Sequence, residues 1–555
     1  MKRALAGAAL DVACIGALIA VGVMAWPTGA MPGTPPTPEG TPAWATFHDL
    51  LLAGPDAGEW AVAALRLDEG RFEALDTHRM PTWTLLTAAM MRFQPDVVLA
   101  GHLVNHLLML LLPVVLYGLA RFSGGRGVGL TAGLWVAATP VLVESSRRYG
   151  VDPTVAFMIP MAMLAAAASA RWWWLAPLGG AVAGLTMLSH YTTLAHAVPP
   201  LILVLLAGGR GWRRFAGTAL FAAGTAALLW GVYQVYPELD PEGLARDVLE
   251  GIEKTEVEGG ADRSAQVDDV KAKLSELGPG AAHDAIIRIW RAIRPSWMPW
   301  IACLVLPWLG ALGLFLPTPG GSRRLWGALG AWPHGLALVL CLGPLPFLSA
   351  AGAEERYSHN LLPIVILLVA RGAAVVPAAL DAAVVRKLRW WPAGAIMLVI
   401  GGWWGKTAWD AAQWSLQPKP ALVQDVEGWK VGRVLKRHFE RGGHVASPYR
   451  EATAMAGREY CPLTACPFGS TLGSFRECLA IMNEECDGEG GLAYVVLKKT
   501  EFDERSDARK AMDTWVAETW DPVGTVKGRT LAAQVFEIPR DELPARSPRM
   551  PPPTP

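Results

Sequence analysis

Two carboxylates stand close together near the start of the chain, in the stretch GPDAGEW at residues 54–60. Asp56 and Glu59 lie three positions apart, behind a proline and around a glycine. A carboxylate can act as a general base on an incoming hydroxyl group. The same spacing also suits a helix start, with Asp56 as the N-cap and Glu59 at the third helical position, as in a capping box. The sequence leaves both roles open, since a catalytic aspartate can also cap a helix.

More ionisable side chains follow in later segments between apolar runs. The candidate substrate-binding residues are His78, Arg79, Asp152, His190, Arg291, Arg294, Arg356 and Tyr357. Arginine and histidine can hold a phosphate leaving group, where negative charge builds up as the bond breaks. Together with a carboxylate base, such residues suit the transfer of a group from a lipid phosphate to an acceptor.

Several of these residues also have simpler explanations. Arg291 and Arg294 lie beside an apolar stripe that is typical of an interfacial helix, so they could instead anchor lipid headgroups. His190 could satisfy a local hydrogen bond. The acidic pair that precedes Arg356 could consist of solvated turn residues.

The composition indicates where these residues must work. The chain has 555 residues, of which 52% are hydrophobic, and its mean hydropathy is +0.28. These values are too apolar for an ordinary soluble enzyme and indicate a polytopic membrane protein. The formal net charge is zero, so there is no overall basic character to suggest nucleic-acid binding.

Eleven apolar runs are close to the length of about 20 residues that a membrane-spanning helix needs. They lie near residues 1–26, 97–120, 127–143, 153–170, 173–189, 191–207, 214–235, 297–317, 331–349, 358–377 and 391–409. The first run could be a signal peptide, but its apolar stretch exceeds the usual signal core of about 7–15 residues. We therefore read it as a retained helix.

The charges between these runs predict an orientation. With Lys2 and Arg3 inside, every loop on the cytoplasmic side carries Arg or Lys, as the positive-inside rule expects. The opposite loops are 27–96, 144–152, 236–296 and 350–357. The candidate residues lie on this external side, and so does the chain from about residue 410.

The C-terminal region reads as a small α+β domain. We expect helices at 426–443 and 503–520, a buried strand at 492–499, and a hairpin around Lys527 and Gly528. The predicted organisation is a transmembrane catalytic domain at 1–410, an extracytoplasmic domain at 411–541 and a disordered tail at 542–555.

Four cysteines cluster in this C-terminal domain: Cys461, Cys466, Cys478 and Cys486. They could form two disulfides or a zinc site. Their spacing fits zinc ribbons poorly, which favours disulfides and therefore an oxidising compartment.

Four stretches resemble the motifs of a known superfamily. They are GPDAGEWAVAALRL at 54–67, HRMPTW at 78–83, GLTMLSHYTTLAH at 184–196 and EERYSHNLLPIVILLVARG at 354–372. In this order and on one side of the membrane, they resemble motifs of the GT-C membrane glycosyltransferases, which include the protein O-mannosyltransferases. The overall layout resembles that superfamily along nearly the whole chain.

This resemblance implies a polyprenyl-phosphate sugar donor, an inverting single displacement, and the first-loop aspartate as the base. That role falls on Asp56, with Glu59 as its partner. The chain departs from the motif where Ala57 replaces a serine and where Arg79 stands in place of a proline. The resemblance implies no cofactor, although a carboxylate pair leaves a divalent metal ion open.

The sequence therefore predicts an α-helical polytopic membrane protein with about eleven transmembrane helices, in the plasma (inner) membrane. The predicted activity moves a sugar from the lipid-linked donor to a hydroxyl of a protein, lipid or glycan, with membrane lipid as the other partner. One alternative is a transporter or flippase of lipid-linked sugars, which would need ionisable residues within its spans. The other is a non-catalytic membrane assembly protein, in which the first-loop acids would be helix caps only.

The orientation can be tested with reporters fused after residue 541. We expect alkaline phosphatase, which is active only outside the cytoplasm, to be active there, because the Arg and Lys of alternate loops place this end outside. A fluorescent protein that matures only in the cytoplasm should stay dark in the same position. If the fluorescent fusion is bright and the phosphatase fusion is inactive, the orientation is opposite to the one predicted.

Overall fold

Long apolar helices lie where the hydropathy of the sequence predicts membrane spans. The computed structural model describes residues 2–25, 37–52, 55–70, 80–123, 126–137, 139–147, 149–208, 211–235, 332–343, 360–368, 370, 421–438, 444–447, 450–456, 460–462, 492–498, 516, 518–527 and 532–539. Within these residues, four helices are long and apolar enough to cross a membrane: α1 (Lys2–Ala25), α4 (Val97–Ser123), α7 (Asp152–Arg171) and α10 (Trp212–Val235). The chain is thus an integral membrane protein, as its composition predicts.

Other predicted spans are bent or broken into shorter helices. Helices α5 (Arg126–Ala137) and α6 (Pro140–Arg147) are together apolar enough for one further span, with a bend of 60° between them. The runs at 173–189 and 191–207 each consist of a 3-10 turn and a short helix, namely η3 (Trp173–Leu175) with α8 (Ala176–Met187) and η4 (Tyr191–Ala197) with α9 (Val198–Ala207). Proline occupies the first turn of both α8 and α9. It fits there because the N–H that proline lacks would have no partner within the helix.

The remaining predicted spans are described in part or not at all. The runs at 331–349 and 358–377 contain α16 (Trp332–Leu340) and the helical residues 362–368. The predicted spans at 297–317 and 391–409 lie outside the described residues. The total of eleven spans therefore stays a prediction.

A half-buried aspartate joins the first helix to the rest of the bundle. The Asp11 carboxylate of α1 accepts hydrogen bonds from the Tyr117 hydroxyl (2.5 Å) and from Arg126 Nε (2.8 Å). Arg121 Nε, at the end of α4, also reaches it at 3.1 Å. The charge that the sequence places inside the first apolar run therefore has partners from α4 and α5.

Helices α8 and α10 approach each other closely at glycines. A Cβ added at Gly180 of α8 would collide with the Phe221 carbonyl oxygen and would lie 2.8 Å from the Thr225 nitrogen, both of α10. At this crossing, the Thr225 hydroxyl donates a 2.9 Å hydrogen bond to the Gly180 carbonyl. Small residues allow membrane helices to come this close, and the contact then adds dispersion energy and an interhelical hydrogen bond.

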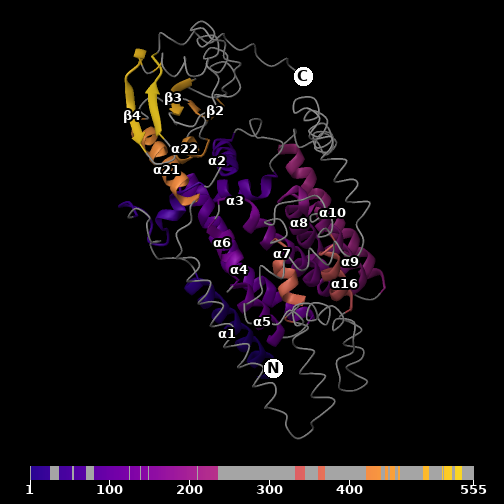
Figure 1. Cartoon of the computed structure of the whole chain (residues 1–555). Coiled ribbons are helices and arrows are strands. Elements are labelled where there is room, and N and C mark those ends of the chain that lie inside the picture. Colours follow the sequence, from indigo (N-terminus) through magenta and orange to yellow (C-terminus); the bar gives the residue numbers. More distant parts are fainter. Residues whose placement is uncertain are drawn as a thin grey trace, which may run out of the picture.

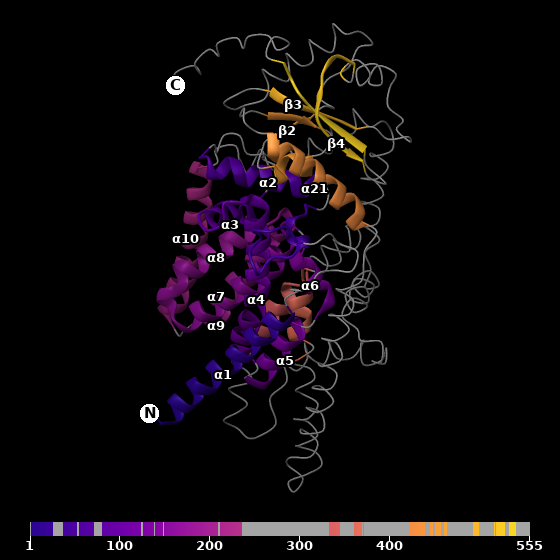
Figure 2. The ribbon, with the colours of Figure 1, turned by 90° about the vertical axis from the view of Figure 1, so that its left-hand side faces the viewer.

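Two short helices of the segment between α1 and α4 lie at one end of the bundle. They are α2 (Pro55–Asp68) and α3 (Pro81–Met91), preceded by the 3-10 turn η1 (Phe47–Leu50). Figures 1 and 2 show α2 and α3 between the membrane-spanning helices and the C-terminal sheet. The loop that carries the candidate acids is therefore enclosed between two parts of the structure.

The C-terminal region combines helices with a five-stranded sheet in the order β2-β1-β3-β5-β4. Its elements are α21 (Ala421–His438), β1 (His444–Ser447), α22 (Arg450–Met455), β2 (Tyr460–Pro462), β3 (Leu492–Lys498), β4 (Pro522–Lys527) and β5 (Ala532–Glu537). The pairs β1–β2 and β1–β3 are parallel, whereas β3–β5 and β4–β5 are antiparallel. The predicted helix at 426–443, the strand at 492–499 and the hairpin are thus confirmed, while most of the predicted helix at 503–520 lies outside the described residues.

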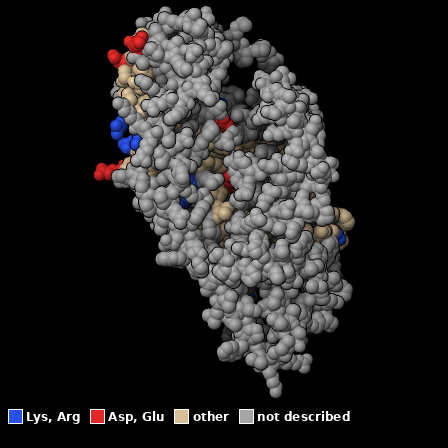
Figure 3. Space-filling view, in the orientation of Figure 1, with Lys and Arg blue, Asp and Glu red and all other residues tan. Residues whose placement is uncertain are grey.

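Helix α21 joins this sheet to the helix bundle. Val431 and Leu435 are fully buried in the small core that the helix shares with β1, β4 and β5. Basic residues on its other side stay exposed, and Lys and Arg side chains gather beside α21 and β4 on the face shown in Figure 3. The helix is therefore amphipathic, as its sequence predicts.

The close contact of α8 and α10 predicts a strong effect of Gly180→Val. Overpacking usually costs about 1–3 kcal/mol, and we expect a loss near the upper end, about 3 kcal/mol, because the clashing atoms are backbone. The measurement is the melting temperature of the purified protein in detergent. Gly231→Val in α10 is the matched control, since nothing lies within 4 Å of a Cβ added there. Equal melting temperatures of the two variants would contradict the contact.

Candidate active site

Asp56 lies inside the first turn of α2 and not before it. The helix begins at Pro55, so Asp56 is its second residue, and the N-cap position expected for it in a capping box is wrong by two residues. A carboxylate in the first turn of a helix still interacts favourably with the helix dipole. Glu59, one turn further on, is half-buried.

One face of α2 packs into the core of the bundle. Ala57, Ala61 and Ala64 are at most 1% exposed, and Trp60 is 5% exposed. Counted from Ala57, the four residues stand at i, i+3, i+4 and i+7, and this spacing places them on one helix face. Small alanines let α2 come close to its neighbours, so burial of this face fixes the rotation of the helix that carries Asp56 and Glu59.

Trp83 of α3 connects the segments that carry the candidate residues. Its side chain is fully buried, and its ring meets those of Trp60 and Tyr149 edge-on, with centroids 5.8 and 4.8 Å apart. Its indole Nε1 donates a 2.7 Å hydrogen bond to Asn105 Oδ1 of α4. Edge-to-face contacts of this kind stabilise aromatic pairs beyond the area that they bury. Trp83 thus joins α2, α3, α4 and the turn before α7.

The turn before α7 brings Asp152 toward the same end of the bundle. Tyr149, three residues earlier, is buried and donates a 3.1 Å hydrogen bond to the Val97 carbonyl. Burial raises the pKa of the Tyr149 hydroxyl well above its ordinary value, and the charge of Asp96 adds to this. The phenol therefore stays neutral and acts as a donor. Asp152 itself is the half-buried first residue of α7.

His190 lies beside the start of α3. The backbone N–H of Thr82 donates to the Leu188 carbonyl (3.1 Å), and the Thr82 hydroxyl donates to the Leu185 carbonyl (2.8 Å). These bonds fix the end of α8, two residues before His190, against the HRMPTW segment. The His190 backbone N–H donates to the Thr193 hydroxyl at 3.2 Å, and its side chain is 8% exposed.

A buried carboxylate that the sequence did not single out lies just upstream of α2. Asp49 Oδ1 is 2.7 Å from His106 Nε2, and each of the two side chains is 2% exposed. The other carboxylate oxygen accepts from the Thr46 N–H (2.7 Å) and the Thr46 hydroxyl (2.9 Å). Burial acts to raise the pKa of the Asp49 carboxyl, but His106, His102 and the Thr46 N–H together hold this pKa well below its usual range. Asp49 is therefore ionised, and both of its carboxylate oxygens have hydrogen-bond partners.

His102 extends this arrangement by one helical turn. Its Nε2 lies 3.0 Å from the Leu51 carbonyl oxygen, and its Nδ1 lies 4.0 Å from Asp49 Oδ1. His102 and His106 are spaced i, i+4 on α4, so they face the same side of the helix. The sequence showed both histidines inside an apolar run, which signals a polar partner, but nothing in it marked Asp49 as that partner.

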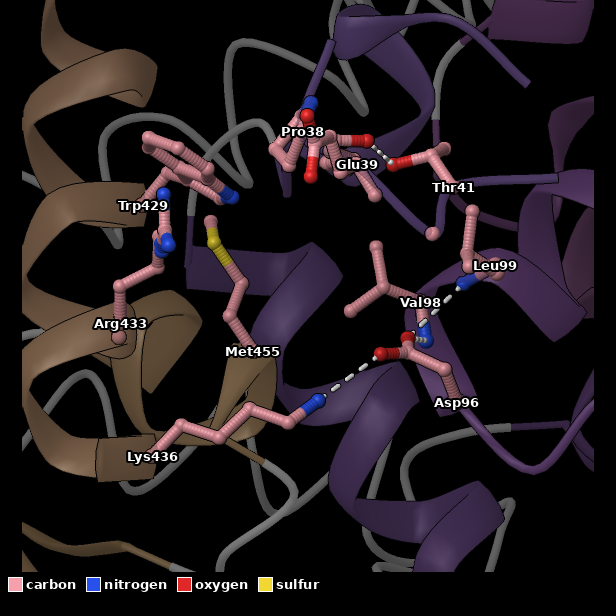
Figure 4. A pocket seen from close by; sticks show the side chains of 13 residues that line it. Pro38, Glu39, Thr41, Asp96, Val98, Leu99, Trp429, Arg433, Lys436 and Met455 are labelled. Carbon is pink, nitrogen blue, oxygen red and sulfur yellow. Dashed lines mark hydrogen bonds and ion pairs between the residues drawn. The ribbon is translucent and has the colours of Figure 1, made fainter. Parts of the chain in front are cut away.

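An open groove lies between the C-terminal region and the first loop. It has a volume of about 370 Å³ and is lined from α21 and α22 on one side and from residues 38–41 and the start of α4 on the other (Figure 4). Lys436 crosses it to Asp96, with Nζ 3.2 Å from Oδ2. The Arg433 guanidinium lies over the Trp429 ring, 5.0 Å from its centroid. The groove is therefore polar at its rim, with paired charges.

The described residues test the geometry of only some of the predicted site residues. Asp56, Glu59, Asp152 and His190 lie in the segments joined by Trp83 and the start of α3. The other predicted substrate-binding residues are outside the described part of the chain: His78, Arg79, Arg291, Arg294, Arg356 and Tyr357. Of the four clustered C-terminal cysteines, Cys461 lies in β2, and the other three are outside the described residues. In the described ranges, no group of three or more His, Cys, Asp or Glu is placed to hold a metal ion.

Comparisons with known proteins agree with the resemblance that the motifs indicate. Residues 78–234 match the family of dolichyl-phosphate-mannose-protein mannosyltransferases. No curated protein matches the whole-chain sequence at a significant level. The matched region runs from the HRMPTW segment through α10, and so includes Trp83, His102, His106 and His190.

Solved structures extend the similarity over nearly the whole chain. ArnT from Cupriavidus metallidurans bound to undecaprenyl phosphate has a TM-score of 0.54 and 14% identity, over 96% of this chain and 99% of that one. Its apo state has a TM-score of 0.51, over 98% and 100%. At this identity the comparison shows the fold. The resemblance to the GT-C membrane glycosyltransferases is confirmed.

The position of Trp83 predicts a large effect of Trp83→Ala. Truncating a fully buried tryptophan costs about 3–5 kcal/mol, so we expect a much lower melting temperature of the purified protein in detergent. Trp174→Ala is the control, because that tryptophan is 65% exposed, and its loss should change stability by less than about 0.5 kcal/mol. Similar melting of both variants would show that Trp83 does not hold these segments together.

Proposed function

We propose that this protein transfers a sugar from a polyprenyl-phosphate donor to an acceptor hydroxyl on the outer face of the membrane. The observation that carries this proposal is the convergence of α2, α3, α4 and the turn before α7 on Trp83. The segments at 54–67 and 78–83, which resemble the glycosyltransferase motifs, meet there, and Thr82 bonds to the third such segment, 184–196. The family match over residues 78–234 supports the same activity.

The lipid nature of the donor follows from the membrane setting and from a structural relative. ArnT, which shares the fold over nearly the whole chain, was solved with undecaprenyl phosphate. A lipid-phosphate donor keeps its sugar at the membrane surface, where α2 and α3 lie. We propose that the cationic candidates hold the donor phosphate: His78, Arg79, His190, Arg291, Arg294 and Arg356. Tyr357 and Asp152 would contact the donor or the acceptor.

Asp56 acts as the general base in this proposal. The carboxylate takes the proton of the acceptor hydroxyl while that oxygen attacks the anomeric carbon, and the bond from this carbon to the phosphate oxygen breaks. Polyprenyl phosphate leaves with the electron pair, and its charge is stabilised by the cationic side chains. A single displacement of this kind inverts the anomeric configuration. Glu59 would orient Asp56 or the acceptor.

The polar groups inside the spans favour this activity over transport. A transporter needs ionisable residues near the midplane that can bind its substrate. Asp11 is held by Tyr117, Arg121 and Arg126, and His106 is held by Asp49. Within the described helices, these residues therefore join neighbouring elements, whereas most of the candidate residues lie between the apolar runs.

Purified protein in lipid vesicles tests the proposal. It is incubated with a panel of undecaprenyl phosphates that carry radiolabelled mannose, glucose, galactose or arabinose, together with a cell-envelope extract as the acceptor. Release of undecaprenyl phosphate and labelling of an acceptor support the enzyme. Movement of the intact donor across the bilayer without release, or no reaction with any donor, would refute it.

Asp56→Asn is the sharpest variant, because asparagine keeps the shape of the side chain and removes the basic oxygen. General base catalysis contributes about 10²–10⁴-fold, so we expect at least about a hundredfold lower turnover with normal folding. Glu59→Gln should lose less. Asp68→Asn, at the other end of α2 where Asp68 pairs with Arg92 at 3.4 Å, is the control and should keep its activity. Full turnover by a well-folded Asp56→Asn protein would exclude this residue as the base.

A further inference from the structure

The segment just before α2 is fastened to α4 by buried polar contacts that the proposed reaction does not use. His106 Nε2 lies 2.7 Å from Asp49 Oδ1. One turn earlier on the same helix, His102 Nε2 lies 3.0 Å from the Leu51 carbonyl. Thr46 closes the other side of the Asp49 carboxylate through its N–H and hydroxyl. The chain from Thr46 to Leu51 is thus fixed at several points.

Stability alone does not explain such a group of residues. Taking a carboxylate and an imidazole out of water carries a desolvation penalty that their attraction often only offsets, and well-packed apolar residues frequently stabilise a protein as much. Buried polar pairs do fix geometry, because their hydrogen bonds are directional and costly to leave unmade. The arrangement therefore suits a role in positioning.

What these contacts position is the start of α2. Only three residues separate Leu51 from Pro55, where the helix begins, and the first of them, Leu52, is fully buried. On the far side of Asp56, Trp60 packs against Trp83 with ring centroids 5.8 Å apart. Asp56 thus lies between two fixed points, one upstream on α4 and one downstream on α3.

We propose that Asp49, His106 and His102 form a positioning clamp for Asp56. This inference rests on the proposed function, in which Asp56 is the general base. A base must lie within hydrogen-bond reach of the hydroxyl that it deprotonates, and a misplacement of about 1 Å can lower a rate on the order of a hundredfold. Asp49 is not the base itself, since both of its oxygens are engaged.

A double-mutant cycle tests the clamp in the full-length protein. Asp49→Ala and Asp56→Asn are made singly and together, and single-turnover rates are measured with the undecaprenyl-phosphate sugar that the wild type uses in the donor panel. We expect Asp49→Ala to lower this rate at least about tenfold, with the dissociation constant for undecaprenyl phosphate changed less than about twofold. In the Asp56→Asn background the same change should have almost no further effect, because residues that act through one another are not additive.

Three further variants separate positioning from general destabilisation. Asp11→Ala removes a carboxylate held at the other end of α4, and it should lower the melting temperature without slowing single turnover. Thr46→Val deletes one hydrogen bond of the clamp and serves where Asp49→Ala does not fold, with an expected loss of a few fold on the scale of one hydrogen bond. Asp49→Asn still accepts a hydrogen bond from His106 but turns an NH2 donor toward Thr46, so it should recover only part of the rate that Asp49→Ala loses. Amide hydrogen exchange in the first turn of α2 should rise in Asp49→Ala and stay unchanged in Asp11→Ala.

The outcomes distinguish the inference from the proposed function. A wild-type rate in both Asp49→Ala and Thr46→Val, with Asp56→Asn inactive, overturns the clamp and leaves the function standing. An equal loss from Asp49→Ala in both backgrounds also overturns it, because the effect would then not pass through Asp56. Full activity of Asp56→Asn with an inactive Asp49→Ala would make Asp49 the base; this overturns the clamp and the role of Asp56, while sugar transfer itself stands. A wild type without activity on any donor refutes the proposed function itself.

Discussion

The hydrogen bond between Asp49 and His106 shows the constraint under which this end of the protein is built. A polar group inside an apolar bundle cannot hydrogen-bond to water, so it needs a hydrogen-bond partner from another part of the chain. Here the partner of a histidine on a membrane helix is an aspartate from the segment between α1 and α4. The loop can therefore take only those paths that keep its carboxylate against α4. The same constraint operates at Asp11, where a charge in the first helix selects its neighbours in α4 and α5.

Much of the architecture could be predicted from the sequence, because hydropathy and alternation are local signals. The apolar runs at 97–120 and 214–235 are single helices, and the strand at 492–499 and the hairpin after it are present. Where the prediction of straight spans failed, local chemistry explains the difference. Prolines at the starts of α8 and α9 break two of the runs, and Pro140 separates α6 from α5.

The site was harder to predict, because its contacts join residues that are distant in sequence. His106 and Asp49 are 57 positions apart, and no short motif relates them. The motif segments themselves could be found, and Trp83 is the last residue of one of them, but nothing in the sequence indicated that this tryptophan joins them. The capping box was wrong because Pro55, which favours the first helical position, starts α2 one residue before Asp56. Propensity thus outweighed the side-chain pattern.

The 3-10 turn η1 is synthesised early, and it contacts α21, a helix that is synthesised late. Phe47 meets Trp429 of α21 with ring centroids 4.7 Å apart, and Lys436 of the same helix reaches Asp96, a residue made 340 positions earlier. The first loop emerges from the ribosome long before α21 exists. During that interval the loop holds its contacts with α4 but lacks the wall that α21 supplies. The enclosure around the first loop is therefore completed last, so a chain that ends early would leave that side open to water.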